Sequence, residues 1–286
     1  MPELPEVETI KNDLRKKTWG KQFKEVVSDN PKMFTPRFSV ARKKLIGSKI
    51  KDVFRRSKLL IIKTNKNLFL LIHLKMTGQL VYSPKKGKII AGGHPIVNER
   101  NLPNKFTHAI FYFKDGSVLY FNDVRKFGYV KLVDKKSLDK ILENFGVEPL
   151  NREFTLEKFK EILKKRKTGK IKQVLMDQKQ ISGIGNIYAS EALFYAGISP
   201  LCPAGKITDK EAKKLFKNIK KVLQKSIERR GTSFSDYVDG EGKKGSFVPL
   251  LKVYGRGGKK CKKCGHILKK TRIGGRGTVY CAKCQK

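Results

Sequence analysis

The chain has 286 residues, and its 65 lysine and arginine residues against 25 aspartate and glutamate residues give a formal net charge of +40. No apolar run approaches the roughly 20 residues of a membrane-spanning helix, and the acidic N-terminus lacks the apolar core of a secretory signal. The sequence therefore predicts a cytoplasmic protein with no membrane partner that binds a polyanion, first of all nucleic acid. A lysine-biased proteome would also raise the charge, but residues 255–286 hold eleven basic residues and no acidic one.

The first half of the chain predicts one helix followed by strands. Apolar residues at Val7, Ile10 and Leu14 recur at helical spacing, which predicts an amphipathic helix from Pro5 to about Lys17. Apolar patterns separated by turn residues predict strands at 23–29, 49–55, 59–64, 68–74, 79–82, 107–113, 118–121 and 127–133. Short strands at this spacing are typical of a sandwich or barrel. Residues 84–105, rich in turn-forming residues, are predicted to form a long loop.

From residue 137 onward the apolar period becomes helical. Helices are predicted at 137–144, 155–165, 170–177, 186–196 and 208–230. Thr155 has the character of an N-cap, and Thr208 with Glu211 has the spacing of a capping box. The change from strand to helix patterns predicts four segments: a β-rich domain at 1–134, a linker at 135–150, a helical domain at 151–250 and a tail at 251–286.

Four of the five cysteines predict a metal site. They form two Cys-x-x-Cys pairs with sixteen residues between them: Cys261, Cys264, Cys281 and Cys284. Two such pairs close a tetrahedron around one zinc ion and leave no open position, so one structural Zn²⁺ is predicted. The tail is too short to build its own core, so metal binding would supply its folding energy. Cys202 stands alone.

The first nine residues lack any basic residue. If Met1 is removed, Pro2 becomes a terminal secondary amine, and α-amino groups with a pKa of roughly 7.7–8 are partly unprotonated near neutral pH. The carboxylates of Glu3 and Glu6 are placed to move protons beside this amine. An ordinary helix start is the alternative, because proline suits the first turn and glutamate favours its positive end. Taken alone, these residues favour the helix start.

A second motif is the Gly183-Ile184-Gly185 turn that precedes the predicted helix at 186–196. Residues 181–200 contain no lysine or arginine, although the chain is strongly basic. A glycine turn at a helix start presents backbone N–H groups that can hold a phosphate, and Asn186 could cap the helix or touch the same phosphate. A tight turn between buried helices is the equal alternative.

Three further segments carry weaker signals. Met76 follows the strand that ends near His73, at a position where methionine is usually core filler. Arg125 and Phe127 lie at a bend between strands, where an apolar side chain beside arginine resembles a wedge for a base stack. The alternative is one satisfied arginine and one core phenylalanine, and these residues taken alone favour that alternative. Lys58 is equally compatible with a phosphate contact and with a plain surface lysine.

Taken in order, these motifs resemble the formamidopyrimidine-DNA glycosylases, bifunctional enzymes that remove oxidised purines from DNA. The resemblance covers nearly the whole chain at residues 2–9, 58, 73–78, 123–128, 183–189, 253–256 and the four cysteines. It implies an α+β multidomain fold: an N-terminal β-sandwich with flanking helices, a helix–two-turn–helix domain and a C-terminal zinc-finger β-hairpin. In the family, damaged double-stranded DNA lies between the two domains of a monomer that uses no small-molecule cofactor, which implies a nucleoid-associated protein of a bacterial-type cell.

The resemblance also implies roles for single residues. Pro2 matches the nucleophile that attacks the sugar C1′ and forms a Schiff base, Glu3 the acid and base at the sugar, and Glu6 a supporting carboxylate beside His73. β,δ-Elimination then nicks the strand. The family's phosphate-contact positions correspond to Lys58, Lys126, Lys172, Asn186 and Arg276, of which Lys58 and Arg276 also belong to the catalytic set. The family's triad that fills the space of the extruded nucleotide corresponds to Met76, Arg125 and Phe127.

Three departures from the family and three alternatives remain. The first departure is the net charge of +40, which is extreme even for a DNA enzyme. The insertion at residues 84–105 is longer than the family pattern, and Lys126 stands where a second arginine is common, which removes bidentate geometry. An endonuclease VIII-type glycosylase would use the same scaffold on oxidised pyrimidines. A non-catalytic protein that binds damaged DNA would use only the ribbon and the glycine turn. An RNA- or ribosome-associated zinc-ribbon protein explains the charge but not the N-terminus.

Overall fold

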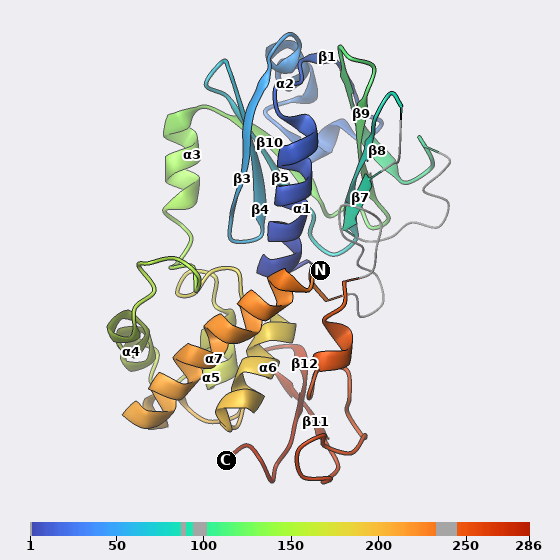
Figure 1. Cartoon of the computed structure of the whole chain (residues 1–286). Coiled ribbons are helices and arrows are strands. Elements are labelled where there is room, and N and C mark those ends of the chain that lie inside the picture. Colours follow the sequence, from blue (N-terminus) through green and yellow to red (C-terminus); the bar gives the residue numbers. More distant parts are fainter. Residues whose placement is uncertain (1, 87–89, 94–101, 233–244) are drawn as a thin grey trace. The chain divides into compact units, whose positions relative to one another are not determined.

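The computed structural model describes residues 2–86, 90–93, 102–232 and 245–286 (Figure 1). By its internal contacts the chain divides into two compact units. The first comprises Met1–Leu142 with Arg229–Ser246, and the second comprises Glu143–Glu228 with Phe247–Lys286. Each unit has a hydrophobic core of its own, so each gains its stability from the burial of its own apolar side chains.

The first unit contains two five-stranded sheets, with strand orders β1-β8-β9-β6-β7 and β2-β10-β5-β4-β3. The strands are β1 Phe23–Val27, β2 Phe34–Thr35, β3 Ile50–Arg56, β4 Leu59–Thr64, β5 Phe69–His73, β6 Gly78–Ser83, β7 Ile90–Gly93, β8 Thr107–Phe113, β9 Val118–Asp123 and β10 Tyr129–Val133. Neighbouring strands run antiparallel, except that β2 and β10 are parallel. The two sheets form the predicted β-sandwich.

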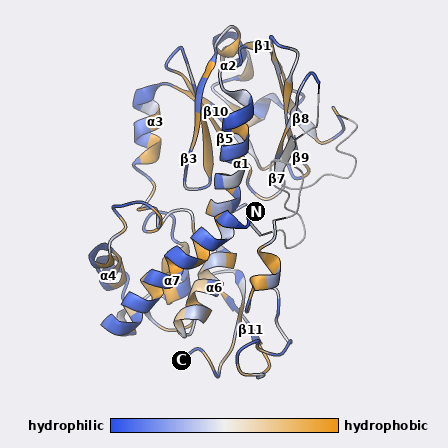
Figure 2. Ribbon diagram, in the orientation of Figure 1, coloured by the Kyte–Doolittle hydropathy of each residue, from blue (hydrophilic) through white to orange (hydrophobic). Residues whose placement is uncertain are grey.

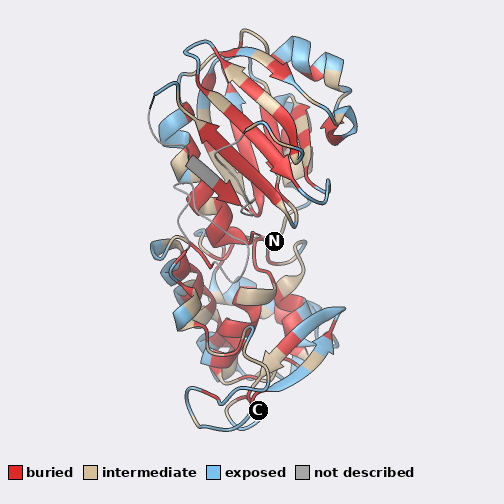
Figure 3. Ribbon diagram, turned by 90° about the vertical axis from the view of Figure 1, so that its right-hand side faces the viewer, coloured by how far each residue is buried: buried red, intermediate tan, exposed pale blue. Residues whose placement is uncertain are grey.

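The alternation of inward-facing and outward-facing side chains along the strands explains the core of the first unit. In β4, Leu60 and Ile62 belong to the core cluster, and Leu70 and Ile72 of β5 belong to the same cluster. Because successive side chains of a strand point to opposite faces, this spacing turns one face of the sheet inward. The unit's helices are α1 Leu4–Thr18, α2 Phe38–Leu45 and α3 Lys135–Leu142. Figure 3 shows that the buried residues of the sandwich are concentrated along its strands, whereas its turns are largely exposed.

The second unit combines four α-helices with a two-stranded hairpin. Its elements are α4 Leu156–Lys165, α5 Ile171–Met176, α6 Asn186–Ala196, α7 Asp209–Glu228, β11 Lys269–Ile273 and β12 Arg276–Tyr280. The predicted caps are confirmed: the Lys158 N–H donates to the Thr155 hydroxyl, and Thr208 and Glu211 bond each other reciprocally. Figure 2 shows that α7 is largely hydrophilic, as its many lysines require. No helix among the described residues is both long and apolar enough to cross a membrane.

Three elements of the sandwich were not predicted, and the first of them is β2, a strand of only two residues. The helix α2 is only eight residues long, too short for its apolar period to stand out. Strand β7 lies inside the predicted loop at 84–105, where its sequence Ile-Ala-Gly-Gly hides its strand character. Gly93 is needed there: a Cβ on this residue would lie 2.4 Å from the Gly78 carbonyl oxygen of β6, and its φ is +125°. The loop prediction was therefore wrong over residues 90–93.

Candidate functional site: an N-terminal carboxylate pair, two joined loops and a zinc ribbon

The start of α1 holds the predicted catalytic residues in a buried setting. Pro2, Glu3 and Glu6 are all buried, with Glu3 and Glu6 only 3% and 2% exposed. Glu3 is the N-cap of α1, and its N–H donates to Glu6 Oε2 at 2.9 Å. Glu6 Oε1 accepts a second bond, 2.8 Å long, from the N–H of Thr232, which lies 226 residues away in the same unit. The Glu6 carboxylate thus fixes the backbone next to Pro2.

The buried Lys58 and the partly buried His73 are two further predicted residues of the first unit. Lys58 is 7% exposed and is the second residue of the turn between β3 and β4. His73 ends β5, and its Nδ1 accepts a 3.0 Å bond from the Lys75 N–H, which leaves the proton of the neutral ring on Nε2. Burial, followed by the positive charges of Lys75 and Lys58, lowers the pKa of His73 to about 3. The His73 ring is therefore neutral at physiological pH. It can donate a hydrogen bond from Nε2 but does not act as a general acid.

A partly buried ion pair links α1 to the Lys58 turn. Glu8 Oε2 lies 2.8 Å from Arg55 Nε, and Arg55 Nη1 donates at 3.0 Å to the carbonyl of Ser57, the residue before Lys58. Ser57 has a φ of +57°, a conformation that L-residues with a Cβ rarely adopt. The Glu8–Arg55 pair therefore ties this turn, and Lys58 with it, to the helix that begins at Glu3.

We expect replacement of Glu8 by glutamine to destabilise the protein in a pH-dependent way. Burial alone would raise the pKa of the Glu8 carboxyl, but the charges and hydrogen bonds of Arg55 and Lys11 outweigh it and lower the pKa. A carboxyl with a lowered pKa stabilises the fold above its unfolded pKa, and this contribution disappears as the pH falls through the folded value. Glu8→Gln should therefore reduce the free energy of unfolding at pH 7 by about 1 kcal/mol.

Denaturant unfolding at pH 7 and at stepwise lower pH would measure this effect. The difference between Glu8→Gln and the unsubstituted chain should shrink as the pH falls. Glu25→Gln is the matched control, because Glu25 forms a longer, 3.5 Å contact with Arg42 and both side chains are nearly half exposed. An equal loss for Glu8→Gln at every pH would show that the charge of Glu8 contributes nothing.

The structure brings the predicted triad together on two joined loops. Met76 lies between β5 and β6, while Arg125 and Phe127 lie between β9 and β10. All three side chains are exposed, Met76 by 36% and Phe127 by 53%, and the Arg125 guanidinium stacks 4.6 Å from the Phe127 ring centroid. Lys126, also exposed, adopts a φ of +55°. Large exposed apolar groups beside a guanidinium suit the predicted wedge better than the predicted alternative of core filling.

Asp123 holds these two loops, and the sequence reasoning missed it. Its side chain is buried and accepts bonds from the N–H of Arg125 at 3.1 Å and of Gly128 at 2.6 Å. It also accepts from the hydroxyl of Thr77 in the other loop, and that hydroxyl in turn accepts from the Arg125 N–H at 3.1 Å. The sequence does contain a signal for this role, an aspartate followed by a turn. Aspartate side chains at such positions often accept hydrogen bonds from the backbone N–H groups of the next few residues.

In the second unit three predicted residues converge on strand β12. Lys172 is fully buried, and its Nζ donates to the Thr278 hydroxyl at 2.7 Å. Asn186 begins α6 and donates from Nδ2 to the Gly277 carbonyl at 3.1 Å. Arg276, the first residue of β12, is exposed. The cluster thus consists of one exposed guanidinium and two side chains that hold its strand.

The glycine turn before α6 presents fewer amides than predicted. The N–H of Gly183 donates at 2.9 Å to the side-chain oxygen of Gln178. The amide nitrogen of Gln178 donates to the carbonyls of Met176 and Ile184, each at 2.8 Å. The Gly183 N–H is therefore not available to a phosphate in this conformation, because a neighbouring side chain satisfies it and braces the turn.

The four predicted cysteines gather at the base of the β11–β12 hairpin. Their Sγ atoms all lie within 4.8 Å of one another, and Cys261 and Cys281 are buried. A tetrahedron of thiolates with zinc–sulfur bonds of about 2.3 Å has edges of roughly 4 Å, so the sulfurs fit one zinc ion. The N–H of Cys281 donates to Gln285 Oε1 at 2.9 Å. These cysteines form a structural zinc-finger site, whereas Cys202 lies outside it.

Comparison with known proteins identifies three consecutive family segments. Residues 1–130 match the formamidopyrimidine-DNA glycosylase N-terminal domain, residues 145–238 match the formamidopyrimidine-DNA glycosylase H2TH domain, and residues 258–286 match a zinc finger found in FPG and IleRS. The resemblance seen in the sequence motifs is therefore confirmed, and so is the predicted fold class.

Relatives and solved structures agree along the full length. Proteins named formamidopyrimidine-DNA glycosylase from Carboxydothermus hydrogenoformans and Pelotomaculum thermopropionicum are 43% and 41% identical, covering all of this chain and 100% and 99% of the relatives. The Lactococcus lactis Fpg, solved with DNA containing an abasic site, superposes with a TM-score of 0.87 at 32% identity, covering 99% of both chains. MutM, solved with DNA containing carbocyclic 8-oxo-G, superposes with a TM-score of 0.85 at 32% identity, covering 100% of both chains. The chain belongs to the formamidopyrimidine-DNA glycosylase family of DNA repair glycosylases.

Proposed function

We propose that this chain excises oxidised purines, namely 8-oxoguanine and formamidopyrimidines, from double-stranded DNA and then cuts the strand as an abasic-site lyase. The observation that carries the proposal is the start of α1, where Glu6 bonds the Glu3 N–H and so fixes the backbone beside Pro2. The lesion class is supported by similar proteins solved with such DNA, the Lactococcus lactis Fpg with Fapy-dG and MutM with 8-oxo-G.

The chemistry begins at the amine of Pro2 once Met1 is removed. The nitrogen lone pair attacks the sugar C1′, a nitrogen–carbon bond forms, and the bond from C1′ to the damaged base breaks. Glu3, a buried carboxyl at the helix start, exchanges the protons that ring opening and base departure require. The resulting iminium makes the C2′ proton acidic, so β-elimination and then δ-elimination release the two phosphates that flank the sugar.

The same proposal assigns the remaining residues to DNA. Attack at C1′ requires an extruded nucleotide, at a cost of roughly a few kcal/mol, which a side chain that fills the vacated space offsets. We assign that role to the exposed Met76, Arg125 and Phe127, with Arg125 reading the opposite cytosine.

The phosphate contacts are assigned to three cationic side chains, of which Lys126 and Arg276 are exposed and Lys58 is buried, and to two residues that support β12. Lys58, Lys126 and Arg276 supply positive charge, which positions the backbone without reading sequence. Lys172 and Asn186 act at the same strand as Arg276, because their side chains bond Thr278 and Gly277.

The proposal is tested by borohydride trapping on matched duplexes that contain 8-oxoguanine opposite cytosine or thymine glycol. Protein shown by intact mass to begin at Pro2 should give a covalent adduct, and should release the oxidised purine faster than the pyrimidine. Faster action on thymine glycol would instead establish an endonuclease VIII-type specificity. Binding with neither an adduct nor base release would establish a non-catalytic protein that binds damaged DNA.

A further inference from the structure

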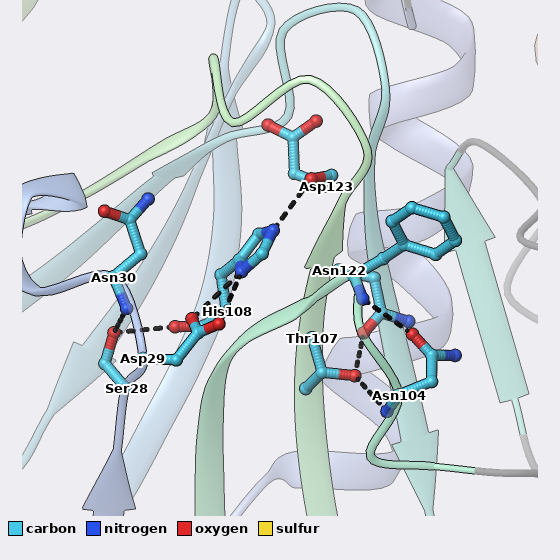
Figure 4. A network of polar contacts seen from close by, with 9 residues as sticks. Ser28, Asp29, Asn30, Asn104, Thr107, His108, Asn122 and Asp123 are labelled. Atoms are coloured by element: carbon cyan, nitrogen blue, oxygen red, sulfur yellow. Dashed lines mark hydrogen bonds and ion pairs between the residues drawn. The ribbon is translucent and has the colours of Figure 1, made fainter.

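A buried histidine contacts the residue that holds the triad loops. His108 of β8 is 2% exposed, and both of its ring nitrogens have partners (Figure 4). Nε2 lies 3.0 Å from the backbone carbonyl of Asp123, and Nδ1 lies 2.9 and 3.1 Å from the two carboxylate oxygens of Asp29. Because a carbonyl oxygen only accepts hydrogen bonds, Nε2 carries a proton and donates it to Asp123.

The hydrogen bond from His108 adds to the other bonds that hold Asp123 in place. The Asp123 N–H donates at 2.9 Å to the carbonyl of Phe106, while its carboxylate holds the loops that carry Met76, Arg125 and Phe127. His108 binds the backbone carbonyl that enters the second loop, at 3.0 Å, whereas the Lys126 N–H within the loop itself reaches the same carbonyl only at the longer distance of 3.4 Å. Since the carboxylate extends from the same residue, a rotation of that peptide would move both loops together.

The strand pairing does not depend on His108. Asn122, the last ladder partner of β8 on β9, is held by its own bonds to Thr107 and Gln79, at 2.8 and 3.1 Å. Removal of the imidazole would therefore leave the ladder in place and release only the Asp123 peptide. Asp29 has a carboxylate that is 57% exposed, so it restrains the ring from the solvent side.

We propose that His108, held by Asp29, is a positioning residue that sets the Arg125–Phe127 loop for reading the base opposite the lesion. The inference rests on the proposed function, in which Arg125 meets the opposite cytosine. His108 touches neither DNA nor the reacting atoms in this scheme. It acts through the Asp123 carbonyl, and its loss should disturb opposite-base discrimination more than the chemistry at Pro2.

Two substitutions separate the hydrogen bond from the volume of the ring. His108→Leu fills the site without a donor, whereas His108→Gln retains an amide N–H that can reach the Asp123 carbonyl. Because His108→Leu removes a buried hydrogen bond, it should slow 8-oxoguanine release opposite cytosine by about tenfold. It should also lower the ratio of the release rate opposite cytosine to the release rate opposite adenine. His108→Gln should recover most of both. Asp29→Leu should give a smaller loss in the same direction.

Strand cutting at a preformed abasic site, which needs no lesion recognition, should stay within about twofold for every variant, since the Pro2 site is untouched. Ser48→Ala is the matched control, because it removes a buried hydroxyl bonded to Leu45 in the same unit and should leave both activities unchanged. An unaltered cytosine preference in His108→Leu, or an equal loss on abasic DNA, overturns the proposal.

A readout independent of activity keeps the two proposals apart. Amide hydrogen exchange of Arg125 and Gly128 should accelerate in His108→Leu and not in His108→Gln. If the unsubstituted protein released no oxidised purine, the proposed function would fail, while the exchange data would still decide whether His108 restrains the loop. Unchanged exchange in His108→Leu overturns the restraint itself.

Discussion

A chain with any residue before Pro2 is expected to bind damaged DNA normally and to form no borohydride-trapped adduct. In the free N-terminal form Pro2 is a secondary amine with a nucleophilic lone pair. A preceding residue converts that nitrogen into a tertiary amide, whose lone pair is delocalised into the carbonyl group. Because Pro2 would be the only nucleophile, adduct formation should fall by about a thousandfold or more, the scale at which an essential covalent group fails.

One fusion protein supplies both halves of this experiment. A cleavable N-terminal extension gives a blocked sample, and cleavage immediately before Pro2 gives the matched active sample from the same preparation. Intact mass defines each N-terminus, single-turnover trapping on 8-oxoguanine DNA measures the chemistry, and fluorescence anisotropy measures binding. Equal trapping by both samples would assign the nucleophile to another amine, of which the buried Lys58 in the same unit is the first to test.

The local parts of this picture could be predicted from the sequence. Spacing alone defined α1, the caps at Thr155 and Thr208 and the four-cysteine site, because each depends on residues close together in the chain. The two readings of the N-terminus also proved compatible. Glu3 is a helix cap, and that same cap fixes the backbone next to Pro2.

The remaining parts depend on contacts that no local pattern records. The bond between Glu6 and Thr232 spans 226 residues, and the bond between Thr77 and Asp123 spans 46. Phe127 alone was better interpreted as a core residue, and only its exposure of 53% reverses that interpretation. For the glycine turn the sequence left two equal interpretations, a phosphate-binding turn and a tight turn between helices, and the bond from the Gly183 N–H to Gln178 removes one of the amides that the first would use.

Loss of one zinc ligand is expected to weaken DNA binding by about a hundredfold, because the zinc ion supplies the folding energy of the hairpin and β12 carries the proposed phosphate contact of Arg276. Cys281 is buried in a small cluster with Phe194, Val253 and Leu268, too few apolar groups to hold two strands without metal. In Cys281→Ser the hairpin should unfold locally. Arg276 would then lose its place, and Lys172 and Asn186 would lose Thr278 and Gly277 as partners.

Cys202→Ser is the matched control, because it removes the one cysteine outside the cluster and should retain one zinc ion per chain. Zinc content by metal analysis and affinity for abasic-site DNA by anisotropy would be measured for both variants at one salt concentration. The sandwich should be unaffected in either variant, because the core of the first unit contains no residue of the hairpin. Full DNA affinity in zinc-free Cys281→Ser would mean that the folded hairpin and the proposed phosphate contact of Arg276 contribute little to DNA affinity.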